Sequence, residues 1–321
     1  MWVPKTNSLT GCNLKDILFG SMPPIAFALS VLATQAADSG LRARVEARIA
    51  QAPARAVGVY YHNLATGDSL TVEAATRFHA ASTMKVPVMI QLFRDRDAGL
   101  LSLDDSITVT NTFRSIVDSS PYQLDKADDS DSSLYDRAGQ RVAIRELIEL
   151  METVSSNLAT NLLIARVNPK RANATAHALG ADSILVLRGV EDGKAYRAGL
   201  SNTTTARDLG ALLAAIADGR AASPASCREM LAILGRQHFN EGIPAGLPAG
   251  TTVYHKTGWI GEVVYHDAAL VELPGGGGSR YVLVVLTGGI QKDEDAYALV
   301  RDLSRLVYQA VPRGQLRGRA Q

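Results

Sequence analysis

The stretch His79–Val88, HAASTMKVPV, decides how this sequence is interpreted. Small residues lead up to Ser82, and the residues from Ser82 to Phe93 predict a helix that starts at the serine. Because residues three apart share one face of a helix, Lys85 lies over Ser82, where an amine can take the proton of a hydroxyl. A helix start also presents free backbone N–H groups and a positive dipole end, which can hold an oxyanion. The stretch predicts a serine nucleophile with a lysine base, although so short a pattern needs support from the rest of the chain.

The composition is that of a globular protein with one large domain or two interlocked domains. The chain has 321 residues, of which 46% are hydrophobic and 20% are charged, and its formal net charge is +1. A net charge so close to zero produces no overall electrostatic attraction to nucleic acid or to an acidic lipid surface. We therefore expect a small-molecule or peptide ligand.

The first 36 residues have the features of an export signal. The short apolar run of residues 25–33 is followed by small residues up to Ala36, where a signal peptidase could cut. A membrane anchor would need about 20 apolar residues, and Pro23 and Pro24 shorten the available stretch. The sequence predicts an exported protein, periplasmic or secreted, whose mature chain has no stable membrane span.

The cysteines and histidines give no sign of a disulfide or a metal site. Cys12 would leave with the export signal, so Cys227 is expected to be a small buried residue of a helix. The six histidines show no spacing typical of metal ligands. We therefore expect no metal and no other cofactor.

Hydrophobic periodicity predicts strands near both ends of the chain and helices between them. A helix from Leu41 precedes two early strands, and three late strands precede a final helix. The predicted strands are Ala56–His62, Ser69–Val72, Thr251–His255, Glu262–Leu273 and Tyr281–Leu286, and the final helix is Asp293–Val311. The helices between them include Val142–Glu152, Leu158–Val167, Pro169–Leu179, Thr205–Asp218, capped by Thr203 or Thr204, and Pro224–Gly235, capped by Ser223.

This order of elements predicts a sheet domain built from both termini, with a helical domain inserted into it. The fold class is α/β plus all-α, with an antiparallel sheet flanked by the terminal helices. The sheet domain would comprise residues 37–80 and 237–311, the inserted helical domain residues 81–236, and a basic tail residues 312–321. A ligand is expected in the groove between the two domains.

Two further short runs fall where that groove is expected. The run Ser155–Asn157 interrupts two apolar helices and offers a hydroxyl and an amide from a short loop. The run Lys256–Gly258 lies at the start of the returning strands, and its glycine would let backbone and ligand approach closely.

Together with Ser82 and Lys85, these runs resemble the S-x-x-K, S-x-N and K-T-G motifs of the penicillin-recognising serine hydrolases. That family includes the class A β-lactamases and the D,D-peptidase penicillin-binding proteins, and its order of elements is similar. The resemblance extends from about Ala37 to Val311. It implies a β-lactamase/D,D-transpeptidase-like fold, a β-lactam or a peptidoglycan-like peptide as ligand, and a monomer.

Within this family the run VSSNLATNLLI is most similar to class A enzymes. The resemblance puts Glu191 near the glutamate that activates the deacylating water in that class. The sequence departs from the class where Val-Glu-Asp-Gly-Lys-Ala-Tyr replaces the pattern W-E-P-E-x-x-N, and where Ser156 replaces the aspartate of S-D-N.

The resemblance implies the following reaction. Ser82 would attack the lactam carbonyl, and the N–H groups of Ser82 and Trp259 would hold the oxyanion. The base would be Lys85, if its pKa falls by roughly 3 from about 10.4, or Glu191 acting through a water.

The resemblance also implies roles for the residues around the nucleophile. Ser155 would relay a proton to the leaving nitrogen, and Asn157 would donate to the side-chain amide of the substrate. Lys256 and Thr257, beside Gly258, would receive the substrate carboxylate.

Other polar residues are expected to be structural. Asn161 would tie loops together, His255 and His266 would be sheet residues, and Arg188 would anchor the loop of Glu191 through an ion pair. The acidic stretch of residues 125–136 is expected to be a solvated loop.

The leading hypothesis is a serine β-lactamase that opens lactams through an acyl-enzyme on Ser82 and then hydrolyses it. The alternatives are a D,D-peptidase, or another serine amidase or esterase of the same fold, and a sensor domain that stays acylated. A placed general base is worth about 100-fold to 10,000-fold in rate, so Glu191 distinguishes these functions.

Overall fold

The computed structural model describes residues 40–274 and 279–311. The predicted export signal, the basic tail and the four glycines expected between the last two strands lie outside these residues. The boundaries of the two domains stay a prediction. In the part of the chain that is described, no helix is both long and apolar enough to cross a membrane.

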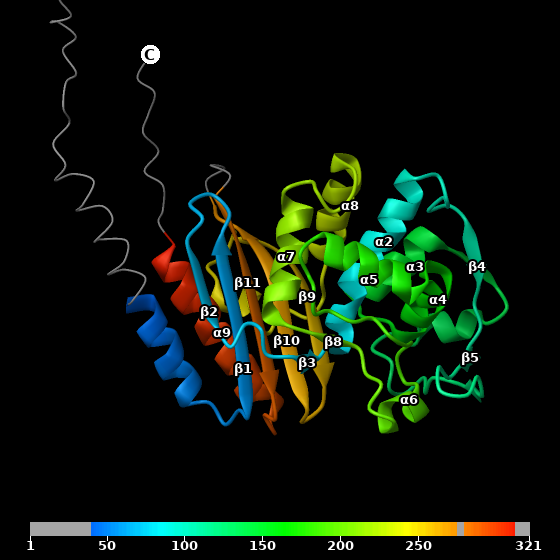
Figure 1. Ribbon diagram of the computed structural model, residues 1–321, viewed down its shortest axis with the longest axis horizontal. Coiled ribbons are helices and arrows are strands. Elements are labelled where there is room, and N and C mark those ends of the chain that lie inside the picture. The colour runs from blue at the N-terminus through cyan, green and yellow to red at the C-terminus, as the bar shows by residue number, and fades with distance from the viewer. Residues whose placement is uncertain (1–39, 275–278, 312–321) are drawn as a thin grey trace, which may run out of the picture. The chain divides into compact units, whose positions relative to one another are not determined.

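Strands from the two ends of the described chain form one antiparallel sheet (Figure 1). Among the described residues its order is β2-β1-β11-β10-β9. The strands are β1 (Ala56–Asn63), β2 (Ser69–Val72), β9 (Thr252–Ile260), β10 (Val264–Glu272) and β11 (Arg280–Gly288). All five were predicted, but β9 continues past His255 because it pairs with β10 along its whole length. The Lys-Thr-Gly run therefore lies within a regular strand.

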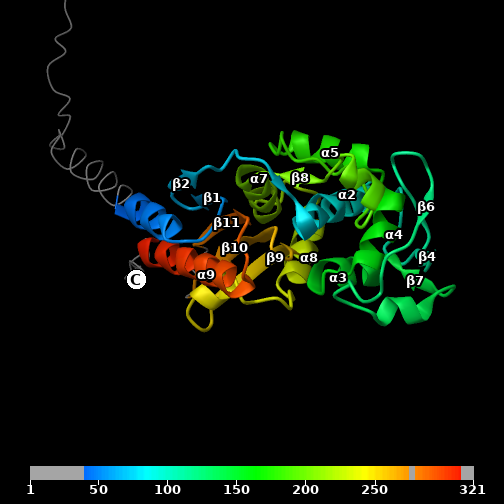
Figure 2. The ribbon, with the colours of Figure 1, turned by 90° about the horizontal axis from the view of Figure 1, so that it is seen from below.

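Alternate residues of the central strands face opposite sides of the sheet. Leu283 packs with the helix of residues 40–50 and with α9 (Asp293–Ala310). The next residue, Val284, packs in a second hydrophobic core on the opposite face of the sheet, and this core includes α7 (Ala206–Ala217). Figure 2 shows α9 and the first helix on one side of the sheet and α7 on the other. The sheet is therefore covered on both faces, which explains its largely apolar strands.

The segment between β2 and β9 is mainly helical, as the periodicity predicts. Its helices are η1 (Ala81–Met84), α2 (Lys85–Asp97), η2 (Ser133–Arg137), α3 (Ile144–Thr153), α4 (Asn157–Val167), α5 (Pro169–Ala178), α6 (Gly193–Arg197), α7, α8 (Pro224–Leu234) and η3 (Pro244–Gly246).

Short two-stranded ribbons, which the periodicity did not reveal, accompany these helices. In the described segment β3 (Phe78–His79) pairs with β8 (Thr203–Thr204), β4 (Ser106–Thr108) with β7 (Arg141–Ala143), and β5 (Phe113–Arg114) with β6 (Pro121–Tyr122). Helix α3 begins at Ile144 and not at the predicted Val142, because Val142 pairs with Ile107 of β4.

Side-chain caps start α7 and α8. The hydroxyl of Thr205 accepts a hydrogen bond from the Asp208 N–H at 3.1 Å, so Thr205 caps α7. The predicted caps, Thr203 and Thr204, lie in β8 instead. Ser223 caps α8, as predicted.

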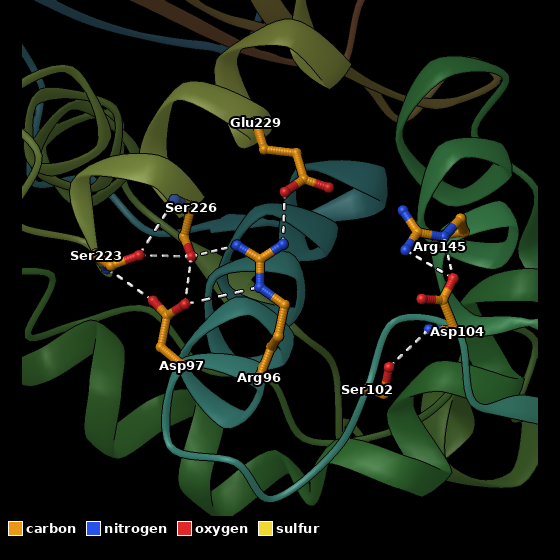
Figure 3. A network of polar contacts seen from close by, with 8 residues as sticks. All are labelled: Arg96, Asp97, Ser102, Asp104, Arg145, Ser223, Ser226 and Glu229. Atoms are coloured by element: carbon orange, nitrogen blue, oxygen red, sulfur yellow. Dashed lines mark hydrogen bonds and ion pairs between the residues drawn. The ribbon is translucent and has the colours of Figure 1, made fainter.

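A network of polar contacts joins the end of α2 to the start of α8 (Figure 3). Asp97 accepts hydrogen bonds from the Ser226 hydroxyl at 2.6 Å and from the Ser223 N–H at 2.8 Å. Arg96 binds Glu229 and the Ser226 hydroxyl. Since Ser226 is fully buried, its hydroxyl depends on these partners.

Replacing Asp97 by alanine is expected to lower the free energy of unfolding by about 1–3 kcal/mol, because the buried Ser226 hydroxyl loses its acceptor. Urea unfolding at pH 7 measures the loss. Asp104→Ala is the matched control: Asp104 forms an exposed ion pair with Arg145 (Figure 3), and its removal is expected to cost less than about 1 kcal/mol.

The effect of Asp97→Ala is also expected to depend on pH. Burial would raise the pKa of Asp97, but hydrogen bonds from Ser226 and Ser223 and the charge of Arg96 hold it below its ordinary value. A group with a lowered pKa stabilises the fold above its unfolded pKa, and this contribution is lost as the pH falls. The difference between wild type and variant should shrink below about pH 4, and a constant difference would contradict this account.

Candidate active site

Ser82 lies in η1, a single 3₁₀ turn between β3 and α2. The α-helix was predicted to start at Ser82, but it starts at Lys85. The preceding residue, Ala81, has a φ of +46°, a left-handed conformation that costs about 1–2 kcal/mol for a residue with a side chain. Its N–H donates to His79 Nδ1 at 3.0 Å, which helps to hold the turn. The chain therefore reverses sharply just before the predicted nucleophile.

Gly258 of β9 allows the strand to lie against this turn. A Cβ at this position would come within 3.1 Å of Thr83 Cγ2 and 3.2 Å of the Ala80 carbonyl oxygen. The sequence suggested a close approach of backbone and ligand at Gly258. In the structure the close approach is to the turn that carries Ser82.

The hydroxyl of Ser155 lies between the amines of two lysines. Lys85 Nζ is 3.1 Å from Ser155 Oγ, and Lys256 Nζ is 3.0 Å from the same oxygen. Lys85 also donates to the Ser155 carbonyl at 2.7 Å and to Asn157 Oδ1 at 3.3 Å. A φ of +59° at Ser155 turns the α3–α4 loop so that carbonyl and hydroxyl reach the same amine. The structure thus connects all three sequence motifs through one hydroxyl.

Burial favours the neutral form of both lysines. Each has an exposed fraction of 0%. Burial, and next the charge of Lys256, lower the pKa of Lys85 well below its ordinary value. Burial lowers the pKa of Lys256 to about 8, although Glu152 and Asp267 act in the opposite direction. Lys85 is therefore the better base, and Lys256 is the better partner for an anion.

Glu191 approaches the same residues from the loop between α5 and α6. Its Oε1 accepts from the Asn157 amide at 3.0 Å, and its Oε2 accepts from the Asp125 N–H at 3.1 Å. Burial raises the pKa of Glu191, and these two hydrogen bonds offset only part of that rise. A raised pKa makes a carboxylate a better proton acceptor near neutral pH.

The loop of Glu191 is held by Asn161 and Arg188. Asn161 pairs with the backbone of Val190, accepting from its N–H at 2.7 Å and donating to its carbonyl at 3.1 Å. Asn161 thus ties loops together, as expected. Arg188 donates to the carbonyls of Gly189 at 3.0 Å and Leu200 at 2.9 Å, in place of the ion pair that was predicted.

Four of the predicted site residues line one pocket of about 320 Å³: Ser82, Asn157, Glu191 and Trp259. Trp259 is 54% exposed, and its indole N–H donates to Asp293 Oδ1 at 2.8 Å. The other predicted residues are buried and do not line this pocket: Lys85, Ser155, Lys256, Thr257 and Gly258. The pocket therefore has the serine and the glutamate on its surface and the lysines behind it.

Most of the acidic stretch of residues 125–136 is exposed, as predicted, but Asp129 and Asp125 contact residues of the site. Asp129 accepts from the N–H groups of Asn157 and Leu158, each at 2.9 Å. A carboxylate at this position satisfies free N–H groups at the start of α4 and complements its dipole. No local pattern could reveal this cap, because Asp129 lies 28 residues before Asn157.

The two histidines of the returning strands lie in the sheet, as expected. His255 Nδ1 is 2.9 Å from Asp267 Oδ1, and His266 Nε2 is 2.8 Å from the His79 carbonyl oxygen. Both rings are buried. Cys227 is likewise buried, on α8.

Comparisons with known proteins concern the family and the fold of the chain. The model of the beta-lactamase enzyme family matches residues 40–311. No curated protein matches the chain significantly.

Solved structures with the same fold include PBP-A, at 32% identity and a TM-score of 0.71 over 84% of this chain and 95% of that one. The beta-lactamase from Sphaerobacter thermophilus DSM 20745 has 28% identity and a TM-score of 0.71, over 85% and 98%. An ancestral class A beta-lactamase has 27% identity and a TM-score of 0.72, over 84% and 100%.

Proposed function

The chain belongs to the beta-lactamase enzyme family, and we propose that it is a serine β-lactamase that works through an acyl-enzyme on Ser82. The observation that carries this proposal is the Ser155 hydroxyl, which lies 3.1 Å from the buried amine of Lys85 and 3.0 Å from that of Lys256. A hydroxyl between a neutral amine and an ammonium can pass a proton from one side of a reaction to the other.

In the proposed acylation, Lys85 takes the proton of Ser82 while Ser82 Oγ bonds to the lactam carbonyl carbon. The ring C–N bond then breaks, and the proton returns through the Ser155 hydroxyl to the leaving nitrogen. The positive charge of Lys256, which is buried behind the pocket, attracts the substrate carboxylate. The lowered pKa of Lys85 supports its role as the base.

In the proposed deacylation, Glu191 takes a proton from a water whose oxygen attacks the acyl carbon. The ester bond to Ser82 breaks, and the proton that Glu191 accepted passes to the Ser82 oxygen, which restores both residues. This role is supported by the position of Glu191 in the same pocket as Ser82 and by its raised pKa.

A D,D-peptidase whose acyl-enzyme hydrolyses lactams slowly is the second candidate. Two observations favour it: both oxygens of Glu191 already accept hydrogen bonds from the protein, and PBP-A is 32% identical to this chain. A second structure of PBP-A, its L158E mutant, is described as an acyl-enzyme complex with penicillin G.

Turnover of a chromogenic cephalosporin, followed together with intact-protein mass spectrometry, tests the proposal. We expect many turnovers per enzyme and an adduct of the acylated protein that disappears when the substrate is used up. A single burst with a lasting adduct would identify the second candidate or a sensor domain. The absence of both turnover and adduct would rule out all three.

A further inference from the structure

Glu152 is a buried acid that the sequence motifs did not single out. It lies in the last turn of α3, and its exposed fraction is 1%. Within the described residues neither carboxylate oxygen has a hydrogen-bond partner. Glu149, one turn earlier on α3, instead binds Arg236 at the surface, with Nε 2.6 Å from Oε1. Burying a carboxylate without hydrogen bonds is expensive, so this acid needs a charged partner.

The charges that act on Glu152 are the two lysines of the site. Lys256 has the largest favourable effect on its carboxylate, followed by Lys85. The ammonium of Lys256 has three N–H donors, of which two go to Ser155 Oγ and the Thr257 carbonyl, each at 3.0 Å. Among the described residues the third donor has no carboxylate partner, so Glu152, the acid with the largest effect on the pKa of Lys256, acts on it through its charge.

We propose that Glu152 is a positioning residue of this site: its carboxylate is the countercharge that keeps Lys256 protonated and so leaves Lys85 as the neutral amine. This inference rests on the proposed function. Two ammonium groups that share the Ser155 hydroxyl repel each other. A single buried carboxylate therefore stabilises the state in which one of the two lysines is protonated better than the state in which both are. Glu152 also acts on Lys85, though less than Asp129 does, and the charge of Lys256 lowers the pKa of Lys85 more than either acid raises it.

The ionisation of Glu152 agrees with this assignment. Burial raises the pKa of Glu152 to about 7, although Lys256 and Lys85 act to lower it. The pKa of Lys256 is about 8, and Glu152 raises it more than Asp267 does. Between these two values Glu152 carries a negative charge and Lys256 a positive one. The lowered pKa of Lys85 favours its neutral form. This is the state that the proposed acylation requires.

The first test uses the free protein and needs no substrate. Lysine labelled with ¹³C at Cε is titrated by NMR in the wild type and in Glu152→Gln, with Lys256 assigned from a Lys256→Arg variant. The titration midpoint of Lys256 is expected to fall by about one pH unit or more in Glu152→Gln. Glu149→Gln, on the same helix, is the matched control and should leave the midpoint unchanged. An unchanged midpoint in Glu152→Gln would overturn the proposal.

The pH dependence of thermal stability provides a second test of the charge of Glu152 that does not depend on enzyme activity. A carboxyl group with a raised pKa stabilises the fold below its unfolded pKa, and this contribution is lost as the pH rises through the folded value. The melting temperature of the wild type should therefore fall relative to Glu152→Gln between pH 4.5 and about 7. Glu152→Met should behave like Glu152→Gln. Parallel curves for wild type and both variants would contradict the charge role.

The pH dependence of acylation connects Glu152 to the reaction. The rate of acylation by benzylpenicillin is expected to fall at alkaline pH. In Glu152→Gln this fall should occur at a pH about one unit or more lower than in the wild type, because Lys256 loses its proton at a lower pH. Glu152→Asp, which keeps a charge, should restore part of the shift. A uniform loss of rate at every pH would indicate a merely structural role. If the wild type is not acylated at any pH, the proposed function fails, and the NMR titration still decides the role of Glu152.

Discussion

Replacing Ser82 by alanine is expected to abolish the acyl-enzyme and to reduce β-lactam turnover by at least about 10⁴-fold. The reason is that Ser82 is the serine that lines the pocket beside Asn157 and Glu191, and it provides the oxygen that bonds to substrate in the proposed reaction. The hydrogen bonds of Lys85 to Ser155 and Asn157 do not involve Ser82, so the site should keep its structure without the hydroxyl.

Intact-protein mass spectrometry after mixing with benzylpenicillin measures the adduct, and a chromogenic cephalosporin measures turnover. Ser102→Ala is the matched control, because Ser102 is an exposed serine of the loop after α2. It should be acylated like the wild type. An adduct that persists in Ser82→Ala would mean that another nucleophile reacts, and the assignment of Ser82 would be wrong.

Replacing Glu191 by glutamine is expected to slow deacylation by about 100-fold to 10,000-fold, while acylation changes little. Glutamine keeps one carbonyl oxygen for the Asn157 amide, so the loop should stay in place, but it cannot take a proton from water. The acyl-enzyme should therefore accumulate, and steady-state turnover should fall to the rate of its slow hydrolysis.

Single-turnover mixing separates the two steps for this variant. Glu146→Gln, a change at an acid of α3 that binds Arg137 at the surface, provides the control. If Glu191→Gln deacylates as fast as the wild type, Glu191 is not the base. If the wild type itself deacylates very slowly and the variant is no slower, the D,D-peptidase candidate is favoured.

Much of the fold could be predicted because its elements carry local signals. Alternation of apolar residues predicted the strands, and the capping residue Ser223 followed by Pro224 predicted the start of α8. The errors occurred where tertiary pairing overrides a local signal. Val142 has helical periodicity with the residues after it, yet it pairs with β4, and Thr203 and Thr204 pair with β3 while Thr205 caps α7.

The candidate site was predictable as a set of motifs but not as an arrangement. Ser82 and Lys85 are close in sequence, so their proximity follows from a turn of helix, although the turn at Ser82 proved to be 3₁₀. The charge on each lysine could not be predicted, because it depends on burial and on acids from other elements. Glu152 illustrates this limit, since a glutamate on a predicted helix is ordinarily a solvated residue.

The sequence by itself determined the order of the elements, the nucleophile motif and the family, because each is expressed by residues that are neighbours along the chain or by short motifs in a fixed order. The tertiary structure alone decided which of the polar groups form hydrogen bonds with one another. Lys256 meets the Ser155 hydroxyl across 101 residues, and Asp129 caps α4 across 28. Contacts over such separations form only when the sheet and the helices pack, and burial then sets the ionisation of the groups enclosed between them.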